Sequence, residues 1–147
     1  MATLIQEIFE SAVVTTNYPR SQIDIFVQVM QADGGQLSAC VNAACLALID
    51  AGIPLSDYVC SVTSSFIEDT PILDLNQTEK SAGGPEMVVA VLPKSKKVLM
   101  TQMDQRLHID KLEGILELAV EGCTQIMEKF DATVRARTAQ LLTSYGK

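Results

Sequence analysis

The sequence predicts an α/β fold of the α+β kind, in which a mixed sheet packs with helices. Helical periodicity marks both ends of the chain, and short β-favouring runs fill its middle. Two helical ends around a strand-rich middle favour one layered domain. The 147 residues, 48% of them hydrophobic, are enough for one core and few for two, and no repeat or linker divides them. We therefore expect residues 1–147 to form a single domain.

The first predicted helix opens the chain and stops before a turn at residues 17–19. Its apolar residues recur three and four positions apart, as one face of a helix requires: Leu4, Ile5, Ile8, Phe9, Ala12 and Val13. In residues 21–31, apolar positions alternate with a mixed set, which predicts a strand with one face in a core. The alternating positions are Ile23, Ile25, Val27 and Val29.

A glycine turn then leads into a second predicted helix. Asp33, Gly34 and Gly35 break the strand, and the helical pattern that follows closes at Gly52 and Pro54. Its apolar positions are Val41, Ala44, Cys45 and Leu48. The unpaired N–H groups and the dipole of a helix N-terminus favour a phosphate, which makes this turn a candidate phosphate site. The alternative is that the glycines supply turn geometry alone.

The second half of the chain predicts short strands followed by one long helix. Strands are expected at residues 58–63 and 72–75, a loop at 81–85, and a hairpin of 87–92 with 98–103. Lys94, Lys96 and Lys97 in the hairpin turn are interpreted as a solvated turn rather than an RNA-binding patch. A capping box of Asp110 and Glu113 would start the last helix. Its apolar positions are Leu112, Ile115, Leu116, Ala119, Cys123, Ile126, Met127, Phe130, Val134 and Leu141.

Charge and cysteine content narrow the classes of function. Eleven basic against eighteen acidic residues give a net charge of −7, the wrong sign for gripping nucleic acid by charge alone, so any RNA role must be local or shared with partners. No DNA partner is expected. Apolar runs such as residues 87–92 are far below the roughly 20 residues of a membrane span, and we expect a soluble, intracellular protein. Four cysteines without a CxxC pair favour reduced, buried thiols over disulfides or zinc ligands. No cofactor or metal is expected.

A few acidic residues are candidates for acid–base chemistry. Asp74 and Glu79, with Glu68 and Asp69 upstream, follow predicted strands, where a carboxylate either donates a proton or simply faces water. His108 lies just before the last helix with no base or nucleophile pattern beside it, and we interpret it as structural.

Several segments, taken as a set, resemble the RNase PH family over nearly the whole chain. They are residues 18–25, 30–35, 47–54, 73–76, 81–84, 102–104 and 107–108, and they include the sequences Tyr-Pro-Arg-Ser-Gln-Ile-Asp-Ile and Asp-Ala-Gly-Ile-Pro. The resemblance implies an RNase PH-like fold of the ribosomal protein S5 domain 2-like type. It also implies that this chain is the C-terminal part of such a domain and lacks the N-terminal strands.

The resemblance also implies which residues stand at the family's site. Active members hold phosphate in a glycine turn with an arginine, and use it to attack the 3′ end of RNA. The corresponding residues here are Gly34, Gly35, Gln36, Leu37 and Ser38, with leucine in place of the phosphate-clamping arginine. Active members also place two aspartates six positions apart for acid catalysis and metal binding. Asp74 matches the first and Lys80 stands at the second, so the two are a degenerate remnant.

By resemblance we expect a catalytically degenerate phosphorolytic exoribonuclease. It would be a structural and RNA-path subunit of the RNA exosome ring, supporting 3′-to-5′ RNA processing, including rRNA processing, and RNA degradation by a separate nuclease. Its expected partners are other RNase PH-like ring subunits and the RNA that passes through the ring, in the nucleus, nucleolus and cytoplasm. One alternative is an active phosphate-dependent 3′-exoribonuclease, which Asp74, Ser38 and the glycine turn favour. Another is a partner-binding module without RNA contact, which the acidic balance favours.

Overall fold

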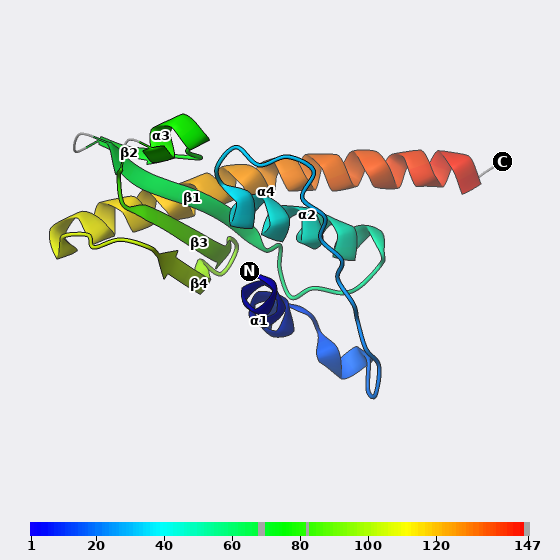
Figure 1. Ribbon diagram of the computed structural model, residues 1–147. Helices are drawn as coiled ribbons and strands as arrows, with labels where there is room; N and C mark the ends of the chain where they lie inside the picture. The colour runs from blue at the N-terminus through cyan, green and yellow to red at the C-terminus, as the bar shows by residue number, and fades with distance from the viewer. Residues whose placement is uncertain (68–69, 82, 146–147) are drawn as a thin grey trace.

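The computed structural model describes residues 1–67, 70–81 and 83–145, and it places one four-stranded sheet between helices (Figure 1). The elements are, in order, α1 (Ala2–Ala12), the 3₁₀ turn η1 (Thr15–Asn17), α2 (Gln36–Asp50), β1 (Cys60–Ile67), β2 (Thr70–Leu73), α3 (Gln77–Ser81), β3 (Glu86–Leu92), β4 (Lys97–Met103) and α4 (Ile109–Tyr145). The predicted α+β class is confirmed, as are the first, second and last helices and the hairpin.

The sheet has the order β2-β1-β3-β4, and every pair in it is antiparallel. β1 and β3 form its centre, with Val62 opposite Val89, and a register shift interrupts the β3–β4 pair at Ala90 and Val91. The expectation of a mixed sheet is therefore wrong for the described residues.

Helices α2 and α4 cover opposite faces of the sheet. Thr63 on β1 bonds Ser38 of α2, whereas a Cβ on Gly122 of α4 would lie 3.7 Å from Val62 Cγ2. Because successive residues of a strand point to opposite faces, Val62 and Thr63 identify the two sides. Burial on both faces explains the unbroken apolar run Met-Val-Val-Ala-Val-Leu of β3, since a doubly covered strand has no solvent face.

The core lies between these layers and contains all four cysteines as free, buried thiols, as predicted. Burial raises the pKa of Cys60 and raises that of Cys123 to about 12, so these thiols stay protonated at neutral pH. Other fully buried side chains are Ile8, Val41, Val59, Met87, Val89, Val91 and Ile115.

Residues 21–31 do not form a strand, and this prediction is wrong. Ile23 and Ile25 pack against the core as the alternation predicted, but the segment pairs with none of the described strands. It instead runs past α1 and α2 (Figure 1). A strand needs a neighbour for its backbone hydrogen bonds, and the four strands of the sheet pair only with one another. Phe26 and Met30 are consequently 94% and 87% exposed.

The structure also differs from the sequence-based expectations at a missed helix and at the start of the last helix. The short helix α3 lies between β2 and the predicted loop, where no helix was expected. The long helix begins at Ile109, so Asp110 lies in its first turn and is not the cap of a capping box. The candidate acids Glu68 and Asp69, and Ala82 of the predicted loop, lie outside the described residues.

Candidate functional site: the pocket beside the glycine turn

The glycine turn before α2 is packed tightly against the chain that follows β2. Gly34 and Gly35 have φ angles of 85° and 53°, the left-handed region that glycine adopts without strain. A Cβ on Gly34 would overlap the carbonyl oxygen of Leu75, and one on Gly35 would lie 3.0 Å from Asp74 Oδ1. Gly34 therefore allows a close approach of two backbone segments as well as the turn geometry, while Gly35 supplies the turn geometry close to the side chain of Asp74.

Polar contacts hold residues 74–77 beside this turn. The backbone N–H of Asp74 donates to the carbonyl oxygen of Thr63 at 2.7 Å, and that of Gln77 donates to Asp33 Oδ1 at 3.1 Å. Asp74 itself has a φ of 56°, which an aspartate tolerates better than most residues. The predicted remnant Asp74 thus lies beside Gly35, on the exposed side of the turn.

Helix α3 begins with a capping box that the sequence analysis overlooked. The N–H of Asn76 donates to Glu79 Oε2 at 2.8 Å, and the N–H of Glu79 donates to Asn76 Oδ1 at 2.9 Å. The signal was visible in the sequence as Asn followed by Glu three residues later. The carboxylate of Glu79, a candidate general acid, therefore caps α3.

Ser38 lies beneath the turn with its hydroxyl group inside the fold. It is 6% exposed and bonds Thr63 Oγ1 at 2.9 Å, and it accepts a hydrogen bond from Ser61 Oγ at 3.3 Å. A hydroxyl group held by two partners on β1 ties α2 to the sheet. Ser38 was predicted to be a phosphate-site residue, but its hydroxyl group is bonded inside the fold.

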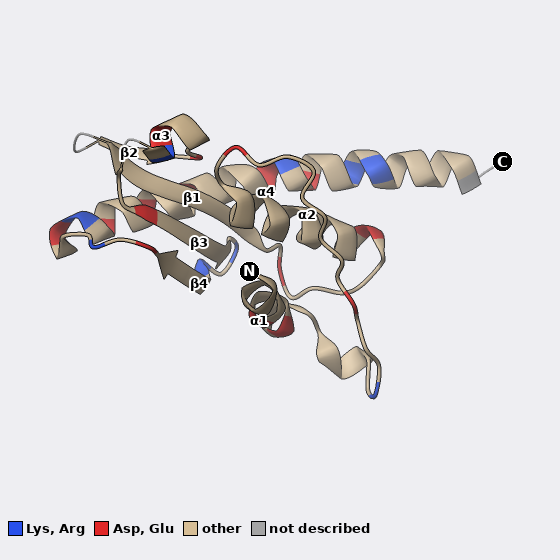
Figure 2. Ribbon diagram, viewed as in Figure 1, with Lys and Arg blue, Asp and Glu red and all other residues tan. Residues whose placement is uncertain are grey.

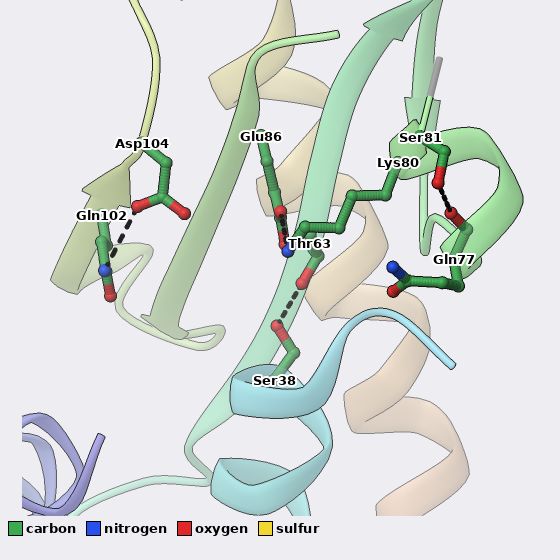
Figure 3. A network of polar contacts seen from close by, with 8 residues as sticks. All are labelled: Ser38, Thr63, Gln77, Lys80, Ser81, Glu86, Gln102 and Asp104. Atoms are coloured by element: carbon green, nitrogen blue, oxygen red, sulfur yellow. Dashed lines mark hydrogen bonds and ion pairs between the residues drawn. The ribbon is translucent and has the colours of Figure 1, made fainter. Parts of the chain in front are cut away.

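A pocket of about 260 Å³ opens beside the turn, and we call it the glycine-turn pocket. Its lining includes Gly34, Gly35, Gln36, Leu37, Gln77, Lys80, Glu86, Val88, Gln102 and Asp104. Four of the five predicted phosphate-site residues and Lys80 of the remnant pair therefore meet in one place. Figure 3 shows five of its polar lining residues, Gln77 and Lys80 of α3, Glu86 of β3, Gln102 of β4 and Asp104 just after β4, together with the Ser38–Thr63 contact.

Lys80 reaches from α3 to the first residue of β3. Its Nζ lies 2.6 Å from Glu86 Oε2, and the side chains are 47% and 14% exposed. This hydrogen bond, with the nearby charges of Glu86 and Asp104, raises the pKa of Lys80. The ammonium group is thus already paired inside the pocket (Figure 3).

Glu86, Gln102 and Asp104 are site residues that the sequence analysis did not identify. The backbone N–H of Asp104 donates to the carbonyl oxygen of Glu86 at 3.3 Å, and Gln102 Nε2 donates to Asp104 Oδ1 at 3.4 Å. Gln102 and Asp104 stood within a segment that resembles the family, which was the available signal. No sequence signal marked Glu86, because its contact with Lys80 exists only when α3 is folded beside β3.

Leu37 is half-buried and packs against the core at the position where the resemblance implies a phosphate-clamping arginine. It offers neither charge nor hydrogen-bond donors to the pocket. Lys80 is the one basic side chain that lines the pocket in the described part of the chain, and it faces the two acidic side chains Glu86 and Asp104. The pocket is therefore less attractive to an anion than its helix N-terminus alone would suggest.

The residues present do not fit the metal that the resemblance implies for active members. A divalent cation takes oxygen ligands, whereas the ammonium of Lys80 occupies a carboxylate oxygen of Glu86. Within residues 1–67, 70–81 and 83–145, no three His, Cys, Asp or Glu side chains gather in a way that would hold a metal.

The other charged candidates lie away from this pocket. His108 is exposed and lies 3.2 Å from Asp110 at the start of α4. Lys96 and Lys97 are exposed as predicted for a solvated turn, while Lys94 lies over the ring of Tyr58 at 5.8 Å from its centroid. Figure 2 shows acidic and basic residues spread over several elements, with basic residues on the C-terminal half of α4. None of the described helices is long and apolar enough to cross a membrane.

Comparison with known families covers most of the chain in two adjoining parts. Residues 1–54 match domain 1 of the 3′ exoribonuclease family, the RNase PH domain. Residues 57–122 match domain 2 of the same family. The second match begins just before β1 and ends within α4.

Curated relatives carry the name exosome complex component RRP41. The chain is 44% identical to the mouse protein over 146 residues, which are 99% of this chain and 60% of that protein. It is 46% identical to the human protein, over 97% of this chain and 59% of that one, and 46% identical to the Arabidopsis thaliana homologue, over 96% and 58%. The chain thus spans about three fifths of the length of these relatives.

Solved structures share the fold at lower sequence identity. Rice Rrp46 superimposes with a TM-score of 0.85 and 21% identity, over 90% of this chain and 63% of that one. A chain of the Archaeoglobus fulgidus exosome with RNA bound to the active site gives 0.66 and 20%, over 88% and 59%. The matches to both family domains, with the identity to the RRP41 proteins, show that the chain belongs to the RNase PH, or 3′ exoribonuclease, family.

Proposed function

We propose that this chain is a non-catalytic subunit of the RNA exosome ring, of the RRP41 type. It would help to form the ring and the RNA path, and so support 3′-to-5′ processing and degradation of RNA, including rRNA, by a separate nuclease. The identity to RRP41 proteins supports the place in the exosome. The state of the glycine-turn pocket supports the absence of catalysis.

One observation carries the non-catalytic part of the proposal: the ammonium of Lys80 is paired with Glu86 at 2.6 Å while Leu37 packs against the core. Phosphorolysis needs a cationic clamp for phosphate and acidic groups for proton transfer or metal binding. In this pocket the basic side chain is neutralised and the clamp position is apolar. Two independent differences from active members, Leu37 and Lys80, therefore argue against turnover.

We expect no phosphorolysis by the purified chain in the presence of single-stranded RNA, phosphate and Mg²⁺. Release of nucleoside diphosphates above a mock preparation is the measurement, and a clear signal would overturn the proposal. Leu37→Arg alone should give no turnover, because Lys80 still opposes a metal. Leu37→Arg with Lys80→Asp in a full-length context is the fair trial for restored chemistry, and strong activity from either single change would show that the site lies elsewhere.

An active phosphate-dependent 3′-exoribonuclease is the second candidate function. Asp74 beside Gly35 and the open N-terminus of the 15-residue helix α2 favour it. A third candidate is a partner-binding module without RNA contact, which the net charge of −7 favours. Crosslinking to RNA within the assembled complex separates the third candidate from the ring subunit, which should crosslink.

The proposed partners are other RNase PH-like exosome ring subunits, especially one of the ribosomal RNA-processing protein 45 type, together with the RNA that threads the ring. We propose the nucleus, nucleolus and cytoplasm as its locations. Co-purification of a tagged chain tests the partners, and imaging of the same tag tests the locations. Absence of ring subunits from the purified material would contradict the proposed assembly.

A further inference from the structure

The glycine-turn pocket contains a cation that is part of the chain. Lys80 stands on α3, and its ammonium group ends on Glu86, the residue that begins β3. Glu86 is held in the sheet opposite Ser65 of β1, and its side chain is 14% exposed. A carboxylate so nearly covered needs a positive partner, because burying an unpaired charge is costly.

The same ammonium group also lies in the field of a second carboxylate. Asp104 contributes to the raised pKa of Lys80, after the hydrogen bond and charge of Glu86. Asp104 is tied to the strand of Glu86 by its backbone N–H, and both acidic side chains line the pocket. One positive group therefore serves two negative ones, Glu86 at the start of β3 and Asp104 just after β4.

We propose that Lys80 is a tethered substitute for a divalent cation in this pocket. Its ammonium group neutralises Glu86 and Asp104 and ties α3 to the sheet, so that the chain needs no metal there. Removal of the ammonium group should convert the pocket into a site for a divalent cation.

The oxygen ligands of the pocket support the expectation that it binds a divalent cation once the ammonium group is removed. Without Lys80, the carboxylates of Glu86 and Asp104 and the amide oxygen of Gln102 remain around a space of about 260 Å³. Hard divalent cations are held by such carboxylate and amide oxygens and keep some of their own water. The present ammonium group excludes them by occupying a carboxylate oxygen and by charge repulsion.

The test is a titration of the purified chain with Mn²⁺ alone, followed by water-proton relaxation. Lys80→Met removes the ammonium group and keeps a flexible unbranched side chain, and it should bind Mn²⁺ at least about tenfold more tightly than the wild type. Lys80→Met combined with Glu86→Gln should return to the wild-type affinity. Lys80→Arg should also resemble the wild type, because the positive charge is retained. Lys129→Met, which removes an exposed lysine of α4, is the matched control and should change nothing.

Equal Mn²⁺ affinity in the wild type and Lys80→Met would overturn the inference, as would tight Mn²⁺ binding by the wild type. If Lys80→Met unfolds without metal, circular dichroism provides the second readout. Mn²⁺ should then restore its helical signal and leave the wild type unchanged, and a failure to do so also rejects the proposal.

This inference rests on the proposed function in one respect, since it gives a physical reason why the pocket of a non-catalytic subunit would take no metal. The titration contains no RNA and no phosphate. A negative result there leaves the phosphorolysis assay unaffected, and phosphorolysis by the wild type leaves the Mn²⁺ comparison unaffected, so the two failures are distinguishable.

Discussion

At the scale of single residues, two glycines with similar backbones differ in their surroundings. Gly34 and Gly52 have φ angles of 85° and 74°. A Cβ on Gly34 would overlap the carbonyl oxygen of Leu75, whereas one on Gly52 would meet nothing within 4 Å. Alanine at Gly52 therefore measures the cost of a left-handed backbone, and alanine at Gly34 measures that cost together with the steric overlap.

We expect Gly34→Ala to lower the free energy of unfolding by about 2 kcal/mol more than Gly52→Ala does. Gly52→Ala itself should cost about 1–2 kcal/mol, the penalty for a left-handed alanine. Urea unfolding of both variants gives the comparison. Equal losses of unfolding free energy would mean that residues 74–76 move away from the new methyl group without cost.

Because the thiols are buried, we expect the free energy of unfolding to fall at alkaline pH. Burial raises the pKa of Cys123 from 9.0 to about 12. Between these values the unfolded chain loses the thiol proton and the folded chain keeps it, so the free energy of unfolding falls as pH rises through this window. Cys123→Ala should show a smaller loss between about pH 8 and about pH 10 than the wild type, in urea unfolding at each pH. Equal losses in the two proteins would show that Cys123 ionises in the fold as freely as in the unfolded chain.

At the scale of elements, one amide side chain makes two of the hydrogen bonds between α2 and β1. Asn42 Nδ2 donates to the carbonyl oxygen of Ser61 at 2.8 Å, and Asn42 Oδ1 accepts from the N–H of Ser61 at 2.8 Å. The side chain thus bonds the backbone of β1 as a neighbouring strand would. It fixes the position of the helix whose N-terminus forms the glycine turn.

We expect Asn42→Ala to lower the free energy of unfolding by about 2 kcal/mol, because it leaves two backbone groups of β1 without partners. Gln125→Ala, an exposed change on α4, should stay within about 0.5 kcal/mol of the wild type. Thermal and urea unfolding measure both. An Asn42→Ala protein as stable as the control would mean that water replaces the amide at no cost.

The elements that the sequence predicted well are the long helices, whose hydrogen bonds are local, and the hairpin strands β3 and β4, which are neighbours in the chain. The three-and-four spacing of Ile5, Ile8 and Phe9 was sufficient for α1, and the apolar run at 87–92 was sufficient for β3. Residues 21–31 showed an equally clear alternation but gave no strand, since a strand depends on a partner elsewhere in the chain. Helix α3 was missed although its capping box was in the sequence, because five residues are too few to show periodicity.

At the scale of the whole molecule, apolar surface remains where residues 21–29 pass α1. A groove of about 1200 Å³ lies between them, lined by apolar residues that include Ile5, Phe9, Ile23 and Ile25. Beside it Phe26 is 94% exposed. An exposed apolar patch next to an unpaired stretch of backbone favours association.

We expect the isolated chain to be marginally stable and to self-associate, and to be stabilised by a ring partner. Sedimentation at two concentrations, with a denaturation curve at each, measures this, because association ties stability to concentration. Phe26→Ser with Met30→Ser should reduce self-association with little loss of stability, since both side chains are exposed. A compact wild-type monomer with a concentration-independent transition would contradict the expectation and would show that these 147 residues form a complete domain.

The sequence by itself determined the α+β class, the three main helices, the hairpin and the family of this protein. Turn geometry singled out Gly34 and Gly35, because glycine turns act over a few residues, and the family resemblance added Leu37 to the candidate site. Only the tertiary structure decided that Lys80 bonds Glu86, that Ser38 turns inward to Thr63, and that residues 21–31 remain unpaired. The physical reason is that strand pairing and the charge balance of a pocket depend on groups brought together from distant parts of the chain, and spacing along the sequence does not encode that distance.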